Sequence, residues 1–279
     1  MSMVTDSTEE VTTPSAQTEG GTGTTHESSG ITVSLTAEPV GHIGRFPVTN
    51  TYIMSLVSII VLSVLAVKLS KKVRRVPKGL QNVAEYIMEA ALSLMDTITG
   101  DRQQSLRFFP LVFTFFIFIL ISNWFGILPG IGSITVMTLE HGEKVAVPLL
   151  RSTNADLNVT VALSLISFFA VEIFGIVTIS LFKYLKKFIN INKNPIFTFV
   201  GFIEFISEIS RVISLSFRLF GNIFAGEVLL IVISFLMPFI LPLPFMFIEL
   251  FVGLIQAFIF AILTLVFLKV ATTEVEHGH

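Results

Sequence analysis

Five long apolar runs limit what this chain can fold into. They cover residues 51–69, 108–128, 157–182, 195–237 and 245–270, and each is long enough for a helix to cross the roughly 30 Å hydrocarbon layer of a bilayer. A transmembrane barrel is excluded, because its strands would be about half as long and would alternate polar with apolar residues. The 279 residues are 52% hydrophobic and only 14% charged. The sequence therefore predicts an all-α integral membrane protein with about five membrane-embedded helices.

The two ends of the chain differ in composition from the middle. Residues 1–47 begin with a stretch rich in Thr, Ser, Gly and Glu, and are expected to form a disordered or extended tail outside the cytoplasm. Alternating apolar residues at 31–35 allow a short strand, which Gly41 and Pro47 are expected to end. The tail is acidic and lacks a basic start followed by an apolar core, so no leader peptide is predicted.

Basic residues beside two of the apolar runs orient the chain. KKVRRVPK, at residues 71–78, follows the first run, and four lysines between 183 and 193 follow the third. Because positive flanks stay in the cytoplasm, the N-terminus is predicted outside and the C-terminus inside. Residues 48–271 then form a single helical membrane domain, and 272–279 a short cytoplasmic tail. The basic clusters and the missing transit peptide suit a bacterial plasma membrane.

Two further segments have distinctive helical patterns. Residues 80–99 mix acids with apolar residues at helical spacing, which predicts an amphipathic helix that ends at Gly100 and Asp101. We expect it on the cytoplasmic side, either on the membrane surface or packed on neighbouring helices. The run from Pro195 to Met237 is about twice the length that a bilayer requires, so it forms one steeply tilted helix or two. Three prolines at 238–244 are expected to turn it into the last span, 245–270, giving a long tilted helix hairpin.

Arg218 lies inside the fourth apolar run, which is an expensive place for a charge. Its guanidinium keeps its proton, and a charge at the centre of a bilayer costs from ~3 to more than ~10 kcal/mol. Asn222 lies four residues on, on the same helical face, while Gly221 and Gly226 leave room for another helix or subunit. We therefore expect a functional polar track through the membrane, and the alternative is a structural ion pair with a glutamate of a neighbouring helix.

Polar side chains of the last two helices fall into two groups. One is a stripe whose members are three, four or seven residues apart, expected to rise from the cytoplasmic side to mid-membrane. The other lies near the outer turn, where one acid from each helix is expected to meet the other. The stripe contains Glu204, Glu208, Arg211 and Arg218, the outer group contains Glu227 and Glu249, and Ser214, Asn222 and Gln256 add further polar groups.

The two groups suggest two access routes for an ion, one from each side of the membrane. The routes do not join, because Arg218 lies between them and its fixed positive charge repels a proton that crosses directly. The ion must therefore be carried past by a carboxylate on another subunit, attracted by Arg218 while ionised and released once it is protonated or loaded with an ion. Arg211 either pairs with Glu208 or lines this path.

Several motifs resemble one family closely. RLFGNIFAGE at 218–227, followed by GLIQAFIFAILTLVFL at 253–268, is similar to the C-terminal half of subunit a of F-type ATP synthases. The resemblance extends to IGRFPVTNT at 43–51, SNWFGILPG at 122–130 and ADLNVTVALSL at 155–165, and so covers nearly everything after the first thirty residues.

The resemblance implies a role for each candidate residue. Arg218 matches the arginine that faces the c-ring carboxylate. Glu204 and Ser214 match the cytoplasmic half-channel, and the outer half-channel is matched by Asn222, Glu227, Glu249 and Gln256. Some members have a histidine at the position of Glu227 or Glu249, whereas this chain has glutamate at both. The titratable groups of its outer path would then all be carboxyl groups. The implied partners are the c-ring, the peripheral-stalk subunit b, the rest of the complex and the lipid bilayer.

Other classes of function fit less well. A self-contained secondary transporter with a charged midplane site is the main alternative, but internal repeats are missing. An intramembrane hydrolase would need a HExxH motif, a pair of membrane Asp residues or a Ser/His arrangement, none of which the sequence contains. There is no P-loop, so no nucleotide site and no catalytic residue of its own are expected. All five histidines lie in tails or a loop and cysteine is absent, so no metal or cofactor is expected. No nucleic-acid partner is expected either.

Overall fold

The computed structural model describes residues 37–43, 46–71, 78–128, 130, 134–140, 143–179, 195–238 and 240–273. All of them belong to one compact unit, Val33–His279. The strand considered at 31–35, the first thirty residues, most of the basic cluster at 71–78 and the lysines between 183 and 193 lie outside the described residues.

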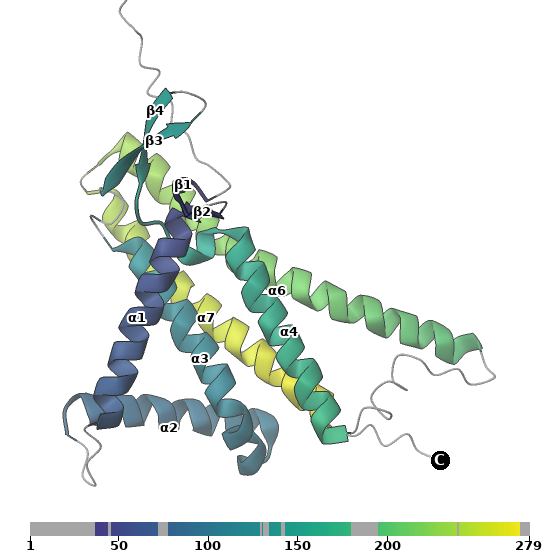
Figure 1. Ribbon diagram of the computed structural model, residues 1–279. Helices are drawn as coiled ribbons and strands as arrows, with labels where there is room; N and C mark the ends of the chain where they lie inside the picture. Colours follow the sequence, from purple (N-terminus) through teal and green to yellow (C-terminus); the bar gives the residue numbers. More distant parts are fainter. Residues whose placement is uncertain are drawn as a thin grey trace, which may run out of the picture. The chain divides into compact units, whose positions relative to one another are not determined.

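Helices make up most of this part of the chain (Figure 1). Five of the described helices are long and apolar enough to cross a membrane, which confirms the prediction of an all-α integral membrane protein. They are α1 (Asn50–Lys71), α3 (Arg102–Ile127), α4 (Leu157–Ile179), α6 (Pro195–Leu236) and α7 (Pro242–Thr272). The amphipathic helix is α2 (Leu80–Thr99). The fourth apolar run is one continuous helix of 42 residues, which answers the question whether it forms one helix or two.

Two short β-hairpins precede and interrupt the helices. β1 (Pro39–Ile43) pairs antiparallel with β2 (Phe46–Thr49), and β3 (Thr135–Glu140) pairs antiparallel with β4 (Glu143–Pro148). The expectation that Gly41 and Pro47 end a strand is wrong, since both lie within strands. The register shifts between Pro39 and Gly41, where a glycine suits an irregular strand, and each strand of a two-stranded ribbon has a free edge that tolerates a proline.

Helix boundaries follow local capping. Gly100 ends α2 in the left-handed conformation (φ 74°) and its N–H donates to Asp96 O at 2.9 Å, as the sequence predicts. Asp101 begins α3 by accepting a hydrogen bond from the Gln103 N–H at 3.0 Å. α3 therefore starts six residues before the apolar run does. α7 starts at Pro242 rather than at residue 245, because proline is tolerated in the first turn of a helix.

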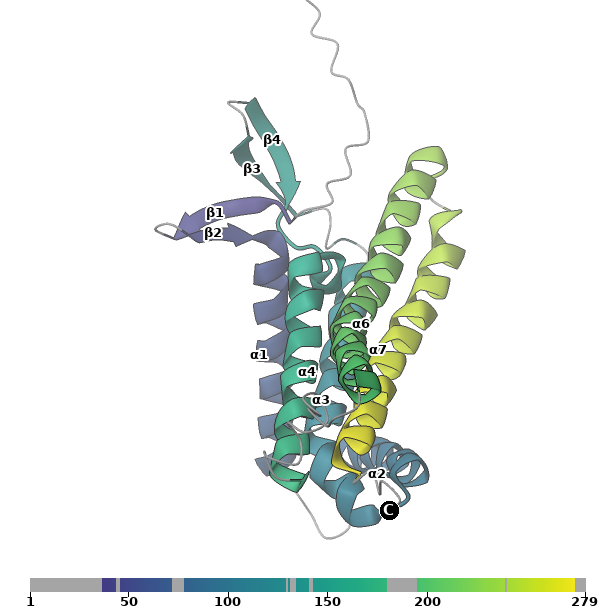
Figure 2. The same cartoon turned by 90° about the vertical axis from the view of Figure 1, so that its right-hand side faces the viewer.

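The spans pack against one another through two buried apolar clusters. One joins α3, α4, α6 and α7, and includes Phe115 and Phe260, whose ring centroids are 5.4 Å apart. The other joins the start of α3 and the end of α7 to α2, through residues such as Met95 and Leu268. Figure 2 shows the hairpins at one end of the spans and α2 at the other. We call these the hairpin end and the α2 end.

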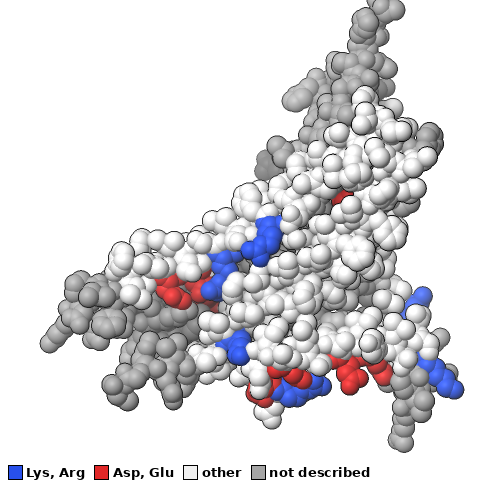
Figure 3. Space-filling model, turned by 180° about the vertical axis from the view of Figure 1, so that it is seen from behind, with Lys and Arg blue, Asp and Glu red and all other residues white. Residues whose placement is uncertain are grey.

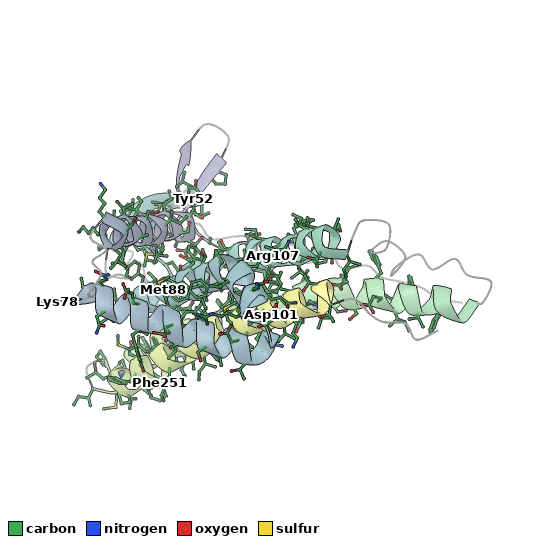
Figure 4. The ribbon with its side chains drawn as sticks, turned by 90° about the horizontal axis from the view of Figure 1, so that it is seen from below. Tyr52, Lys78, Met88, Asp101, Arg107 and Phe251 are labelled. Atoms are coloured by element: carbon green, nitrogen blue, oxygen red, sulfur yellow. The ribbon has the colours of Figure 1, made fainter. Side chains whose placement is uncertain are left out.

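α2 lies across the ends of other helices. Figure 4 views the α2 end, with Lys78 at the start of α2, Met88 along it and Asp101 at the corner where α3 begins. Leu92 and Met95 are buried on its inner side, while Tyr86 is exposed. The Lys269 ammonium of α7 donates to the Ile98 carbonyl at 2.7 Å, which fixes the end of α7 to α2.

Candidate functional site

Arg218 faces out of the described part of the chain. It is exposed on α6, and its Nη2 lies 3.4 Å from Ser214 Oγ, one turn earlier on the same helix. Within the described residues it forms no ion pair with a carboxylate. An arginine in this position has its charge available to a group outside the subunit.

Small and polar residues surround Arg218 on one face of α6. Ser214, Gly221, Asn222 and Ala225 are also exposed, and their spacing places them on the same side of the helix. A Cβ at Gly221 would meet nothing within 4 Å in the described structure. We call these five residues the Arg218 face. Figure 3 shows basic side chains with acidic ones beside them on a largely uncharged surface.

Gln256 of α7 lies near Arg218 on the inner side of α6. It is only 8% exposed, and it lines a shallow hollow together with Arg218, Leu219 and Phe260. Glu249 is seven residues earlier, two turns along the same face of α7. One face of α7 therefore carries polar groups from the hairpin end to the neighbourhood of Arg218.

The first half of α6 carries a paired set of charges. Glu208 is buried, and its Oε2 lies 2.7 Å from Arg211 Nη1. The Arg211 guanidinium stacks 4.0 Å from the centre of the Phe267 ring of α7. Glu204, one turn before Glu208, is half-buried. Of the two alternatives considered for Arg211, the structure shows the pairing with Glu208. Arg211 turns toward α7, whereas Arg218 faces outward.

A second hollow lies beside Arg211, between α4, α6 and α7. Its lining includes the α4 residues Ser164 and Ser167 as well as Arg211. Ser167 Oγ lies 2.9 Å from Thr264 Oγ1 of α7, while the buried Ser164 Oγ has no partner in the described structure. An unpartnered buried hydroxyl of this kind is a position where water can bind.

The two acids of the outer group lie close together at the hairpin end. Glu249 is only 7% exposed and packs against the α6 backbone, so that a Cβ at Gly226 would lie 2.6 Å from its Oε1. Glu227 is the next residue along α6 and is near enough for its charge to interact with Glu249. Gly226 therefore makes the space that brings the two carboxyl groups into one site.

Arg151 also belongs to this site, and the sequence reasoning missed it. Its Nε lies 2.9 Å from Oε1 and 3.2 Å from Oε2 of Glu227, and its side chain is only 6% exposed. The site is thus two carboxyl groups and one guanidinium, rather than carboxyl groups alone. The available signal was that Arg151 is the only charged residue between Lys144 and Asp156.

A buried polar network surrounds these three residues at the hairpin end. Asn154, in the short 3-10 turn η2 (Thr153–Ala155), donates to Asn123 Oδ1 at 2.7 Å, and Asn123 donates to the Gly253 carbonyl at 3.0 Å. Several buried oxygens have no partner in the described structure: Ser122 Oγ, Ser152 Oγ, Thr153 Oγ1, Asn154 Oδ1 and Glu249 Oε2. Unpartnered buried oxygens of this kind are positions where water can bind.

Asp156 caps the start of α4 and also contacts α1. Asp156 Oδ1 accepts from the Asn158 N–H at 2.9 Å, as an N-cap should. Its other oxygen accepts from Thr51 Oγ1 of α1 at 3.0 Å. The side chain of Asn154, two residues earlier, turns inward to Asn123 instead.

Comparison with known proteins identifies the family of this chain. The family model described as "ATP synthase A chain" matches residues 51–269. The chain is 36% identical over 230 residues to the protein named "ATP synthase subunit a" from Campylobacter jejuni subsp. jejuni (strain 81-176), which covers 81% of this chain and 89% of that protein. It is also 36% identical over 240 residues to the protein of the same name from Helicobacter pylori (strain 26695), covering 85% and 91%. The chain therefore belongs to the ATP synthase subunit a family.

Proposed function

We propose that this chain, as the proton-channel subunit of an F-type ATP synthase, provides two offset half-channels separated by Arg218 and drives rotation of the c-ring during ATP synthesis. Its other partners in the complex are the peripheral-stalk subunit b and the catalytic sector. The membrane is the bacterial plasma membrane, with the hairpin end outside and the α2 end in the cytoplasm.

The observation that carries this proposal is the unpaired, outward-facing Arg218. A membrane-embedded guanidinium needs a counter-charge, and the described residues supply none within ion-pair distance. The small residues of the Arg218 face leave room for another helix to come close. A carboxylate on a neighbouring ring subunit would satisfy both conditions. It would be held by Arg218 while ionised and would leave once it takes up a proton.

The outer half-channel is assigned to the hairpin end. Protons would enter among the unpartnered buried oxygens there and reach Glu227 and Glu249. From Glu249 the polar face of α7 leads to Gln256, which borders the Arg218 hollow. Two helical turns along α7 span about 10 Å, a distance that one or two side chains and bound water can bridge.

The inner half-channel is assigned to the first half of α6. Glu204 and Glu208 precede Arg218 by four and about three helical turns, on the side of the helix that begins away from the hairpin end. Ser214 lies one turn before Arg218 and touches it, so it would mark the inner end of the gap. A proton leaving the ring carboxylate would then pass Glu208 and Glu204 toward the cytoplasm.

The ring contact can be tested by site-specific cross-linking. The chain contains no cysteine, so Asn222→Cys carries a photoactivatable maleimide at one defined position of the Arg218 face. Illumination of native membranes is expected to yield an adduct with the small ring subunit. Val64→Cys, on the exposed surface of α1, is the matched control and is expected to yield none. Efficient labelling of Asn222→Cys with no ring adduct would contradict the proposal.

A further inference from the structure

We infer that Arg151 is a positioning residue of the outer half-channel: it holds the Glu227 carboxylate in place and leaves Glu249 as the acid that exchanges protons with water. This inference rests on the proposed function, and it concerns a residue that precedes Glu227 by 76 positions in the chain.

The contacts of the two acids differ. Both carboxylate oxygens of Glu227 lie within hydrogen-bond distance of one Arg151 nitrogen, at 2.9 and 3.2 Å. Glu249 packs against Gly226, and its buried Oε2 has no partner in the described structure. An acid with both oxygens engaged by a guanidinium is fixed in position. An acid with a free buried oxygen can accept a proton or a water molecule there.

The backbone on both sides of Arg151 is held firmly. Before it, the Leu149 N–H donates to the Ile134 carbonyl at 2.7 Å, which closes the β3–β4 hairpin. After it, Ser152 lies so close to α3 that a Cβ at Gly126 would collide with its side chain. The guanidinium therefore reaches Glu227 from a fixed point rather than from a free loop.

The charges of the three groups add up to one exchangeable proton. With both acids ionised, Arg151, Glu227 and Glu249 together carry one net negative charge in a mostly buried site. Uptake of one proton makes the set neutral. Without the guanidinium the same two acids would carry two negative charges, which a site of low dielectric disfavours strongly. Arg151 thus allows the site to hold and release a single proton without ever being doubly charged.

The test is ATP-driven proton pumping in inverted membrane vesicles that contain the whole ATP synthase. The variants are Arg151→Gln, Arg151→Lys, Glu227→Gln and the double variant Arg151→Gln/Glu227→Gln. The assay must resolve pumping rates over at least a hundredfold range. Each preparation is matched for assembled complex by immunoblot and for ATP hydrolysis. Arg107→Gln is the control, because Arg107 is an exposed arginine of α3 that stacks on Phe174 at the α2 end. Its pumping rate is expected to stay native.

We expect Arg151→Gln to lower the pumping rate about tenfold, since it leaves an uncompensated charge in the site. Arg151→Lys keeps the charge and is expected to stay within about threefold of the native rate. If Arg151 acts through Glu227, the Arg151→Gln change costs less than about twofold in the Glu227→Gln background. A merely structural arginine would instead give multiplicative losses and no rescue by lysine.

Other results would overturn the inference. These are native pumping by Arg151→Gln, or equal losses from Arg151→Gln in both backgrounds. If Arg151→Gln does not assemble, the double variant, which removes both charges, is expected to restore assembly, and its failure to do so counts against the inference. Arg218→Ala in the same vesicles separates the two levels. If it abolishes pumping while Arg151→Gln pumps at the native rate, only the role of Arg151 is wrong, whereas native pumping by Arg218→Ala contradicts the proposed function.

Discussion

Single glycines set how closely polar side chains of this chain approach neighbouring helices. Gly226 is the clearest case, because its missing side chain is the space that the Glu249 carboxyl group occupies. A methyl group there must displace the Glu249 carboxyl group. The position of the Glu249 carboxyl group, which we propose carries protons, therefore depends on a residue without a functional side chain.

Gly226→Ala is expected to lower ATP-driven proton pumping at least tenfold, because the added Cβ would lie 2.6 Å from Glu249 Oε1. Combining it with Glu249→Asp, whose side chain is one methylene shorter, is expected to recover part of the rate. Pumping in inverted vesicles measures both. A double variant that is worse than Gly226→Ala alone would show that the clash is not the cause.

The site at the hairpin end also shows where sequence reasoning stops at the residue scale. Arg218, Glu227 and Glu249 stand out because charges in apolar runs are costly and need a reason. Arg151 does not stand out, because it lies in a connecting segment outside the apolar runs, where a charged side chain is ordinary and needs no special reason. Its pairing with Glu227 depends on the folded course of β4 and η2, which no local pattern encodes.

Elements meet through a few specific polar contacts as well as through apolar packing. Asn123 is the best example, since its side chain accepts from η2 and donates to α7 while belonging to α3. Gly253 permits this approach, because a Cβ there would lie 3.1 Å from Asn123 Cβ. Three elements at the hairpin end are thus joined at one buried amide.

Asn123→Ala is expected to destabilise the membrane sector by about 1–3 kcal/mol, because it leaves buried partners on two other elements unsatisfied. The thermal midpoint of the detergent-solubilised complex measures this. Thr97→Ala is the control, because the Thr97 hydroxyl donates only to the Ser93 carbonyl of its own exposed helix surface, at 3.1 Å. Equal midpoints for Asn123→Ala and the native complex would contradict the joining role.

The corner between α2 and α3 gives a pH-dependent contribution to stability. The nearby Ser105 side chain, and then the Arg102 guanidinium, hold the pKa of Asp96 below its usual value, although desolvation opposes them. Because the pKa is lower in the folded than in the unfolded state, the ionised carboxyl group stabilises the fold. This contribution is fully present at a pH above about 4, the ordinary pKa of an aspartate. That stability is lost as the pH falls through the lowered value.

Asp96→Asn is therefore expected to lower the thermal midpoint of the solubilised membrane sector at neutral pH. The difference from the native chain should stay constant down to a pH of about 4 and shrink as the pH falls further, because the native carboxyl then becomes protonated as well. Glu89→Gln removes the same charge from α2 at an exposed position without an ion pair in the described residues, and should change little. A difference that does not shrink at low pH would rule out the explanation.

Most elements could be predicted from sequence, and the exceptions have physical causes. The spans are evident because each needs about 20 apolar residues, and Gly100 and Asp101 mark a helix boundary by their own chemistry. The two hairpins were missed because strands of four to six residues have too few positions for an alternating pattern. Arg211 and Arg218 are seven residues apart, yet they differ because the Phe267 ring is within reach of Arg211.

At the scale of the whole molecule, the account depends on which end of the spans faces the cytoplasm. The hairpins and α2 lie at opposite ends (Figure 2). The proposed direction of proton flow requires the hairpin end, with Arg151, Glu227 and Glu249, to face outward. The basic residues next to the first and third spans predict this orientation.

The absence of cysteine makes the orientation easy to measure. Thr135→Cys lies in an exposed position of β3, and Lys78→Cys lies in an exposed position just before α2. A membrane-impermeant maleimide should label Thr135→Cys in intact cells and Lys78→Cys only in inverted vesicles. Labelling of both positions from the same side would contradict the described arrangement, and the reverse pattern would contradict the proposed orientation.

The most direct measurement of the central claim is ATP-driven proton pumping by inverted vesicles in which Arg218 is replaced by alanine. Assembly and ATP hydrolysis are matched to the native complex. The account predicts that pumping disappears while the complex remains assembled, because the ring carboxylate loses its partner and the two half-channels are no longer separated. Pumping at the native rate would show that Arg218 is structural, and it would contradict the half-channel mechanism.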